Sequence, residues 1–498
     1  MPKGSGIAAL YTSAIWIGGL DTGNNLHLAA NYFRNGCDYF PGPVNAANPS
    51  SFDKIWKVNR YKVEEFKYEW SLGNVQSGTY TPDASILTWP AMIDTSYAPF
   101  VDINNNGIYD PLTGGDYPKV KGDQCLYWIM NDSGAHTVTG GLPMQVEIHA
   151  SAYAYTCPQL PDSEQVLNYT TLYHYEVFNK STNQYDSTFF GYWQDPDLGN
   201  YQDDMVGCYP KGNYGYVYNG DSIDDVFASG YGLHPPMLST IILNGPLADA
   251  GDSIDNDNDS IIDEPGEKNL MTNFGYFMNG GNGQGDPGTS IEFYNYLTAH
   301  WKDGTPFTYG GGGKSGSTPT HFIFPDFPYD TSGWNQMNSG YPASDLRSHM
   351  SCGPFTLLAG AVTDFNFAIV WTRDTALPYL SKAFFDKNYK DNMKIKQWFE
   401  TDSFPSCLVL PQGINESNQN ANSIIISPNP SSDFISVTYK SKTKNPQIEI
   451  LDVMGRKIAE YKLNETALQI NISKLPQGLY LLKVTDGENS FAKRFVKE

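Results

Sequence analysis

Short runs of alternating apolar and polar residues recur along the first 400 residues of the chain. Examples are Tyr11–Ile17, Val146–Tyr155, Thr170–Phe178 and Phe365–Trp371, and segments rich in Gly, Pro, Asn and Asp separate them. A period of two residues is typical of strands with one buried face, and the separating residue types form turns. The pattern therefore predicts a mostly β fold, with a large β-sandwich-like N-terminal region.

One segment near the end of this region has a different period. Between residues 377 and 399 the apolar residues lie near helical spacing, at Leu380, Phe384, Phe385, Met393, Ile395 and Phe399. This spacing places apolar side chains on one face of a helix. We predict one or two helices near 377–399, after the last strand.

The last 75 residues repeat the strand pattern on a smaller scale. Seven short apolar runs lie between residues 424 and 496, and turn formers such as Pro428-Asn429-Pro430, Met454-Gly455 and Pro476-Gln477-Gly478 separate them. Seven strands in so short a segment are typical of an immunoglobulin-like sandwich. We predict a small C-terminal immunoglobulin-like β-sandwich at residues 424–498.

Charge and composition divide the chain at the same place. The net charge of the chain is -22, but residues 424–498 contain 11 basic and 8 acidic residues and carry +3. The segment before them, residues 408–423, is rich in Asn, Ser and Gln, which is typical of a linker. We predict a β-rich region at 1–406, of one or two subdomains, a linker at 407–423 and a separate domain at 424–498.

Four segments of this tail occur in a fixed order. They are SPNP at 427–430, LDVMGRKI at 451–458, INISKLPQGLYLLKV at 470–484 and the basic end KRFVKE at 493–498. Together they resemble the type A sorting domain of type IX secretion system cargo. The residues that match this motif are Pro428, Asn429, Pro430, Gly455, Leu475, Gly478, Tyr480 and Lys493.

The resemblance implies export from a Gram-negative bacterium, through the periplasm, to the outer-membrane surface or the extracellular space. The implied partners are the type IX secretion machinery and a surface sortase, which removes such domains and can attach the cargo to lipopolysaccharide. Segments of residues 5–400, among them AIWIGGLD and GYWQDPDLGNYQDDMVGC, resemble the N-terminal regions of other cargo of this system. That second likeness implies no particular activity.

The first residues of the chain do not have the pattern of an export signal. Thr12, Ser13, Trp16 and the Gly18-Gly19 pair fit a strand and a turn better than an apolar signal core. Since crossing the inner membrane ordinarily needs such a signal, we expect the natural protein to begin upstream of Met1. The six cysteines contain no CxxC pair, and in an exported chain they permit either up to three disulfides or buried thiols.

Two acidic segments have the spacing of calcium-binding loops. The first has acidic residues at positions 1, 3, 5 and 9 of such a loop, and a further carboxylate follows; these residues are Asp255, Asp257, Asp259, Asp263 and Glu264. Hard oxygen ligands on alternate residues of a tight loop can converge on one ion. We predict calcium as the cofactor, with a solvated acidic loop as the alternative.

The second segment, DINNNGIYD, has the same spacing but fewer charges. Its candidate ligands are Asp102, Asn104, Asn106 and Asp110. Asn and Asp also form turns without any ion, so a plain Asx-rich turn is the alternative to calcium. A third acidic group, Asp195, Asp197, Asp203 and Asp204, favours a surface loop, with a metal site or paired catalytic carboxylates as alternatives.

Composition limits the classes of function. The acidic balance argues against nucleic acid as a partner, because phosphate binding needs clustered Lys and Arg. No apolar run approaches the roughly 20 residues of a membrane helix, so we predict no transmembrane segment. The sequence therefore predicts an exported structural, adhesive or ligand-binding ectodomain stabilised by calcium, whose extracellular ligand is unknown and could be a glycan. The alternative is a secreted glycan-active or other hydrolase that uses the same export route.

Overall fold

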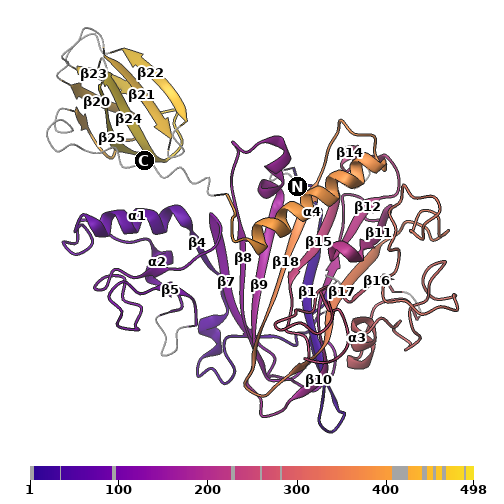
Figure 1. The fold of residues 1–498 in the computed structure, drawn as a ribbon. Coiled ribbons are helices and arrows are strands. Elements are labelled where there is room, and N and C mark those ends of the chain that lie inside the picture. Colours follow the sequence, from indigo (N-terminus) through magenta and orange to yellow (C-terminus); the bar gives the residue numbers. More distant parts are fainter. Residues whose placement is uncertain are drawn as a thin grey trace. The chain divides into compact units, whose positions relative to one another are not determined.

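The chain forms two compact units, residues 1–407 and 408–498. The computed structural model describes residues 5–33, 35–91, 97–225, 230–257, 261–280, 283–405, 424–439, 446–452, 456–462, 467–486 and 489–498. Both units are mostly β, which confirms the predicted fold class (Figure 1). The predicted linker at 407–423 lies outside the described residues.

The first unit contains two large antiparallel sheets. Five strands form one sheet in the order β16 (Asn273–Met278), β17 (Leu346–Leu357), β10 (Tyr185–Asp195), β1 (Thr12–Asp21) and β2 (Leu26–Ala30). The nine-stranded sheet has the order β11 (Asp204–Tyr209), β12 (Tyr214–Asn219), β15 (Met237–Asn244), β18 (Val362–Thr372), β9 (Thr170–Asn179), β8 (Val146–Ala154), β7 (Gln124–Asn131) and β3 (Phe40–Pro41), and β4 (Trp56–Asn59) also pairs with β7. Two short pairs, β5 (Phe100–Val101) with β6 (Tyr117–Pro118) and β13 (Ile223–Asp224) with β14 (Gly232–Leu233), complete the unit.

Aromatic side chains form the contact between the two large sheets. The ring centroids of Phe190 and Phe365 lie 4.3 Å apart, and those of Tyr192 and Phe367 lie 4.4 Å apart. All four side chains are buried, and the first of each pair belongs to β10 and the second to β18. Burial of large rings contributes much of the apolar area that stabilises such a core.

Four α-helices lie among the described residues of this unit, α1 (Arg60–Ser71), α2 (Ala84–Leu87), α3 (Ser290–Leu297) and α4 (Lys382–Glu400). Three short 3-10 helices accompany them, η1 (Pro49–Phe52), η2 (Asp162–Tyr169) and η3 (Pro210–Gly212). Helix α4 is the helix predicted near 377–399, and it buries Phe384, Phe385 and Ile395. Helices α1, α2 and α3 were not predicted. In α1 the only buried apolar residues are Val63 and Phe66, and two such residues do not make a recognisable helical period in the sequence.

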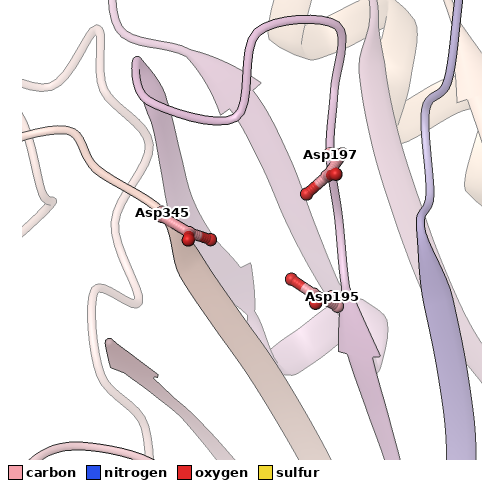
Figure 2. A group of neighbouring side chains, drawn as sticks. All are labelled: Asp195, Asp197 and Asp345. Atoms are coloured by element: carbon pink, nitrogen blue, oxygen red, sulfur yellow. The ribbon is translucent and has the colours of Figure 1, made fainter. Parts of the chain in front are cut away.

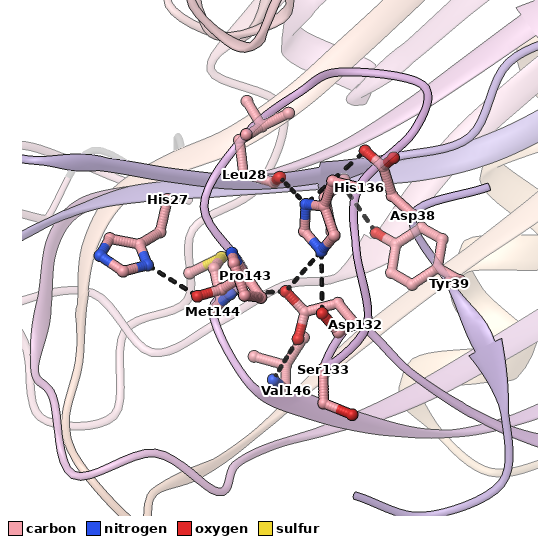
Figure 3. A network of polar contacts seen from close by, with 12 residues as sticks. His27, Leu28, Asp38, Tyr39, Asp132, Ser133, His136, Pro143, Met144 and Val146 are labelled. Atoms are coloured by element: carbon pink, nitrogen blue, oxygen red, sulfur yellow. Dashed lines mark hydrogen bonds and ion pairs between the residues drawn. The ribbon is translucent and has the colours of Figure 1, made fainter. Parts of the chain in front are cut away.

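A buried polar network connects β2 with the segment after β7 (Figure 3). His136 Nδ1 lies 2.7 Å from the carbonyl oxygen of Leu28, and Nε2 lies 2.8 Å from that of Asp132. Because a carbonyl oxygen only accepts, both nitrogens can donate together only when the ring is positively charged. The carboxylates of Asp38 and Asp132 lie 3.8 and 3.6 Å from the ring nitrogens, and all three side chains are inaccessible to solvent.

A second buried histidine, His349, has a different environment. Its ring packs beside those of Trp16, Phe277, Tyr296 and Phe307, and neither ring nitrogen has a hydrogen-bond partner among the described residues. Burial lowers the pKa of His349 from 6.5 to about 3. The folded state therefore holds this ring neutral over a pH range in which the unfolded chain takes up a proton.

This difference predicts an acid-sensitive core. The stabilising contribution of neutral His349 is complete above pH 6.5 and decreases by roughly 1.4 kcal/mol per pH unit as the pH falls from 6.5 towards 3. In urea unfolding measured from pH 7 to pH 4, H349F should show a shallower loss of unfolding free energy than the natural sequence. Parallel pH curves for the two proteins would contradict this expectation, whatever their absolute stabilities.

The second unit consists of two small sheets. The first has the order β19 (Ile424–Ser427), β20 (Phe434–Tyr439), β23 (Ala467–Asn471), and the second has the order β22 (Lys457–Lys462), β21 (Gln447–Asp452), β24 (Gly478–Asp486), β25 (Asn489–Lys497). These seven strands lie at the seven predicted apolar runs. Inward residues of both sheets, among them Ile424, Val437, Ile448 and Leu482, form a core of their own.

Two further features bear on the predicted export of the chain. Cys157 is disulfide-bonded, whereas Cys37, Cys125, Cys208 and Cys352 are free thiols. No helix within the described ranges combines the length and the apolar character needed to cross a membrane.

Candidate functional site

The first predicted calcium loop brings three carboxylates together. Asp255, Asp257 and Glu267 each place one carboxylate oxygen within 4.8 Å of the others. Glu267 is buried, and one of its oxygens accepts a hydrogen bond from the backbone N–H of Asn256. The side-chain oxygen of Asn256 is itself buried, and it has no hydrogen-bond partner among the described residues. Three carboxylates at this separation can provide the hard oxygen ligands that calcium takes.

The other predicted ligands of this loop have different places. Asp259 lies outside the described residues. Asp263 Oδ1 accepts a hydrogen bond from the N–H of Ser253 at 3.1 Å, and neither Asp263 nor Glu264 belongs to the carboxylate group. Glu267 was missed because it lies one residue beyond position 12 of the loop pattern. The chain turns between Glu264 and Glu267, where the carbonyl oxygen of Glu264 accepts a hydrogen bond from the N–H of Glu267 at 3.2 Å. This turn places Glu267, and not Glu264, in the carboxylate group with Asp255 and Asp257.

The second predicted loop is closed by its own hydrogen bonds. Asp102 accepts the N–H groups of Asn106 and Gly107 at 3.3 and 2.8 Å, and Gly107 has a φ of 76°. The amides of Asn104 and Asn106 donate to Asp110 at 3.3 and 3.4 Å. This is the arrangement of an Asx-rich turn.

Asp116 is a buried member of this loop that sequence reasoning missed. Its carboxylate accepts the N–H groups of Ile103 and Asp110, at 2.9 and 3.0 Å. Burial raises the pKa of Asp116, and the neighbouring carboxylate of Asp110 adds to that effect. A cation bound here would offset the repulsion between the two carboxylates.

The third acidic group separates into two sets in the fold. Asp195 and Asp197 meet Asp345, with one oxygen of each within 4.8 Å of the others, and their side chains point towards one another (Figure 2). Asp204 is buried and accepts the N–H of Leu198 at 3.0 Å, so it closes the loop after β10. The carboxylate of Asp203 accepts a hydrogen bond from the side chain of Asn200 at 3.2 Å.

The residues of the tail motif connect the two ends of the second unit. Asn429 Nδ2 donates to the carbonyl of Arg494 at 3.1 Å, and Asn429 Oδ1 accepts the N–H of Val496 at 2.8 Å. The ammonium group of Lys493 donates to the carbonyl of Ile424 at 2.9 Å. The SPNP segment and the basic end of the chain are therefore parts of one structure.

Three further motif residues, Leu475, Gly478 and Tyr480, lie at or just before the start of β24. Tyr480 stacks on Phe495 with ring centroids 5.5 Å apart, and its hydroxyl donates to the carbonyl of Pro476 at 2.9 Å. Leu475 packs against the core of this unit, and Gly478 has a φ of 154°, which residues with a side chain rarely adopt. Pro428 and Pro430 flank Asn429, and Gly455 lies outside the described residues.

A shallow pocket of about 380 Å³ lies on the first unit. Its lining combines aromatic, hydroxyl and amide groups, from Tyr309, Thr331, Ser332, Trp334, Asn338 and Ser339, with backbone at Gly311 and Gly333. Tyr309 is half exposed. Among the described residues that line it, the side chains are neutral.

Comparison with known proteins identifies the tail. Residues 425–498 match the family model of the secretion system C-terminal sorting domain. None of the curated proteins compared with the chain matches it. Among solved structures, a polysaccharide lyase aligns with 6% sequence identity and a TM-score of 0.20, over 70% of this chain and 34% of that one. The chain thus spans about a third of the length of that lyase, and so low a score supports no conclusion about fold or activity.

Proposed function

Since the chain carries a type IX sorting domain and is exported cargo of that system, we propose that its first unit is a calcium-stabilised, non-enzymatic ectodomain. It would act at the outer-membrane surface or in the medium, in a structural, adhesive or ligand-binding role. The sorting domain at residues 425–498 carries the export part of this proposal. The convergence of Asp255, Asp257 and Glu267 supports the calcium part.

The charges of the first loop favour a resident cation. Without one, three carboxylates within 4.8 Å repel each other, by roughly 1 to 4 kcal/mol per close pair depending on the local dielectric. A divalent cation converts this repulsion into attraction and closes the loop on itself. The loop at 102–116 would bind a second ion with Asp102, Asp110 and Asp116, after the amides of Asn104 and Asn106 turn their oxygens inwards.

The shallow pocket beside Tyr309 and Trp334 supports binding over hydrolysis. An exposed aromatic ring surrounded by hydroxyl and amide groups suits a polar ligand such as a glycan. The described residues of its lining include no carboxylate, whereas a glycosidase ordinarily uses a pair of them, so the pocket favours the binding role over the hydrolase alternative. Glycan-array binding together with a hydrolysis screen distinguishes the two roles, and turnover of any glycan would overturn the non-enzymatic assignment.

Removal of calcium is expected to destabilise the first unit. An ion that binds only the folded state stabilises it by RT ln(1 + [L]/Kd), about 2.7 kcal/mol at 100 times Kd. The melting temperature should therefore fall by several degrees in excess chelator, and the double variant D257N/E267Q should lose most of this response. The exposed Asp53→Asn is the matched control and should keep it. Identical melting curves with and without chelator would refute the calcium part of the proposal.

A further inference from the structure

The carboxylates of Asp195, Asp197 and Asp345 lie where the chain crosses between the two large sheets. Asp195 ends β10 in the five-stranded sheet, and the next strand, β11, belongs to the nine-stranded sheet. Asp345 directly precedes β17, which pairs with β10 through Gln194 and Ser348. The loop that contains Asp197 therefore connects the sheets, and Figure 2 shows its carboxylate facing the other two.

One oxygen of Asp195 lacks the partner that its burial requires. The side chain of Asp195 is 3% exposed, and Oδ2 accepts a hydrogen bond from Arg347 Nη2 at 3.1 Å. Oδ1 is buried and has no hydrogen-bond partner among the described residues. A buried carboxylate oxygen is ordinarily paired with a donor or a metal ion. Asp195 is therefore an unsatisfied acceptor whose carboxylate points towards two further carboxylates.

The net charge of the group matches that of a divalent cation. Arg347 binds both Asp195 and Asp345, so the group carries -2 when all three carboxylates are ionised, as they are when they bind a metal ion. Arg347 alone thus leaves a negative charge uncompensated.

The burial of the group distinguishes a bound ion from a catalytic pair. A catalytic carboxylate must touch its substrate, and Asp195 is too deeply buried for a glycan to reach. Asp197 and Asp345 are partly exposed, which leaves an entry path for an ion. Calcium accepts irregular sets of six to eight oxygens, whereas magnesium requires a near-ideal octahedron.

We propose that Asp195, Asp197 and Asp345 bind one calcium ion that ties the crossover loop after β10 to the start of β17. This site is separate from the two loops of the proposed function. The ion would occupy the position that the unsatisfied oxygen of Asp195 faces. It would also hold the connection between the two sheets in place.

Calcium counting tests the site. The full chain is prepared with D110N, D255N and D257N, which disable the two loops, and bound calcium per chain is measured by equilibrium dialysis. Addition of D197N should remove one further ion, whereas D364N should remove none. Asp364 is the matched control, because it is a partly buried aspartate on β18 that lies outside the carboxylate group. Retention of the same number of ions by D197N and by D345N would overturn the site.

Thermal unfolding gives a second readout, because the shift in melting temperature caused by D197N should have opposite signs with and without calcium. In chelator, D197N should raise the melting temperature, because it removes repulsion between carboxylates; in calcium it should lower it, because it removes a ligand. A merely structural role for Asp197 would move both melting temperatures the same way, and that result would count against the ion. The same measurement on the natural sequence keeps the two proposals apart. If the two loops bind no calcium but this site does, the natural sequence binds one ion per chain, so either proposal can fail without the other.

Discussion

Removal of residues 424–498 is expected to leave the protein in the periplasm, with at least a tenfold loss from the cell surface and the medium. These residues form a separate compact unit with its own core and match a sorting domain over nearly their whole length. Because the machinery reads this unit, the fold of the first unit should not compensate for its loss. Cell fractionation and surface protease accessibility in a type IX-competent bacterium measure the distribution.

The complementary fusion tests whether the tail is sufficient. A folded foreign protein with an N-terminal signal peptide and residues 424–498 at its C-terminus should reach the outside of the same cells. The matched control is the same fusion in cells that lack the type IX machinery, where it should stay in the periplasm. Periplasmic retention in competent cells would show that the tail alone does not direct export.

The substitution D38N is expected to destabilise the first unit by about 3–5 kcal/mol, the usual effect of breaking a buried charged network. Asp38 is inaccessible to solvent, and its two oxygens accept hydrogen bonds from Val138 N at 2.9 Å, Ala30 N at 3.2 Å and Thr139 Oγ1 at 2.6 Å. An Asn amide would direct its N–H groups at one of these backbone donors in either orientation. The substitution would also remove the carboxylate that lies 3.8 Å from the ring of His136.

Tryptophan fluorescence during urea unfolding measures this effect in the intact chain. All ten tryptophans precede residue 407, so their emission reports the first unit alone. The control D53N, at an exposed position, should change the unfolding free energy by less than about 0.5 kcal/mol. Equal midpoints for D38N and the natural sequence would mean that the network of Figure 3 contributes little to stability.

The sequence alone determined the features that depend on neighbouring residues. A strand with one buried face repeats every two residues, so the seven strands of the tail were predictable from their alternation. The SPNP segment and the basic end identified the sorting domain, because the motif is defined by residue types and by their order along the chain. Helix α4 was predictable for the same reason, since its apolar residues have helical spacing over several turns.

The tertiary structure decided which side chains meet. Asp255 and Asp257 were expected to share an ion with Asp263 and Glu264, but a turn brings Glu267 to them instead. Asp345 and Arg347 join Asp195 only through the pairing of β10 with β17, and Arg347 lies 152 residues from Asp195 along the chain. Strand β10 is buried on both faces along its second half, because it lies in the middle of its sheet and packs against the nine-stranded sheet. Local pattern specifies how a segment buries its own side chains, whereas a cation site depends on distances that only the packing of distant segments sets.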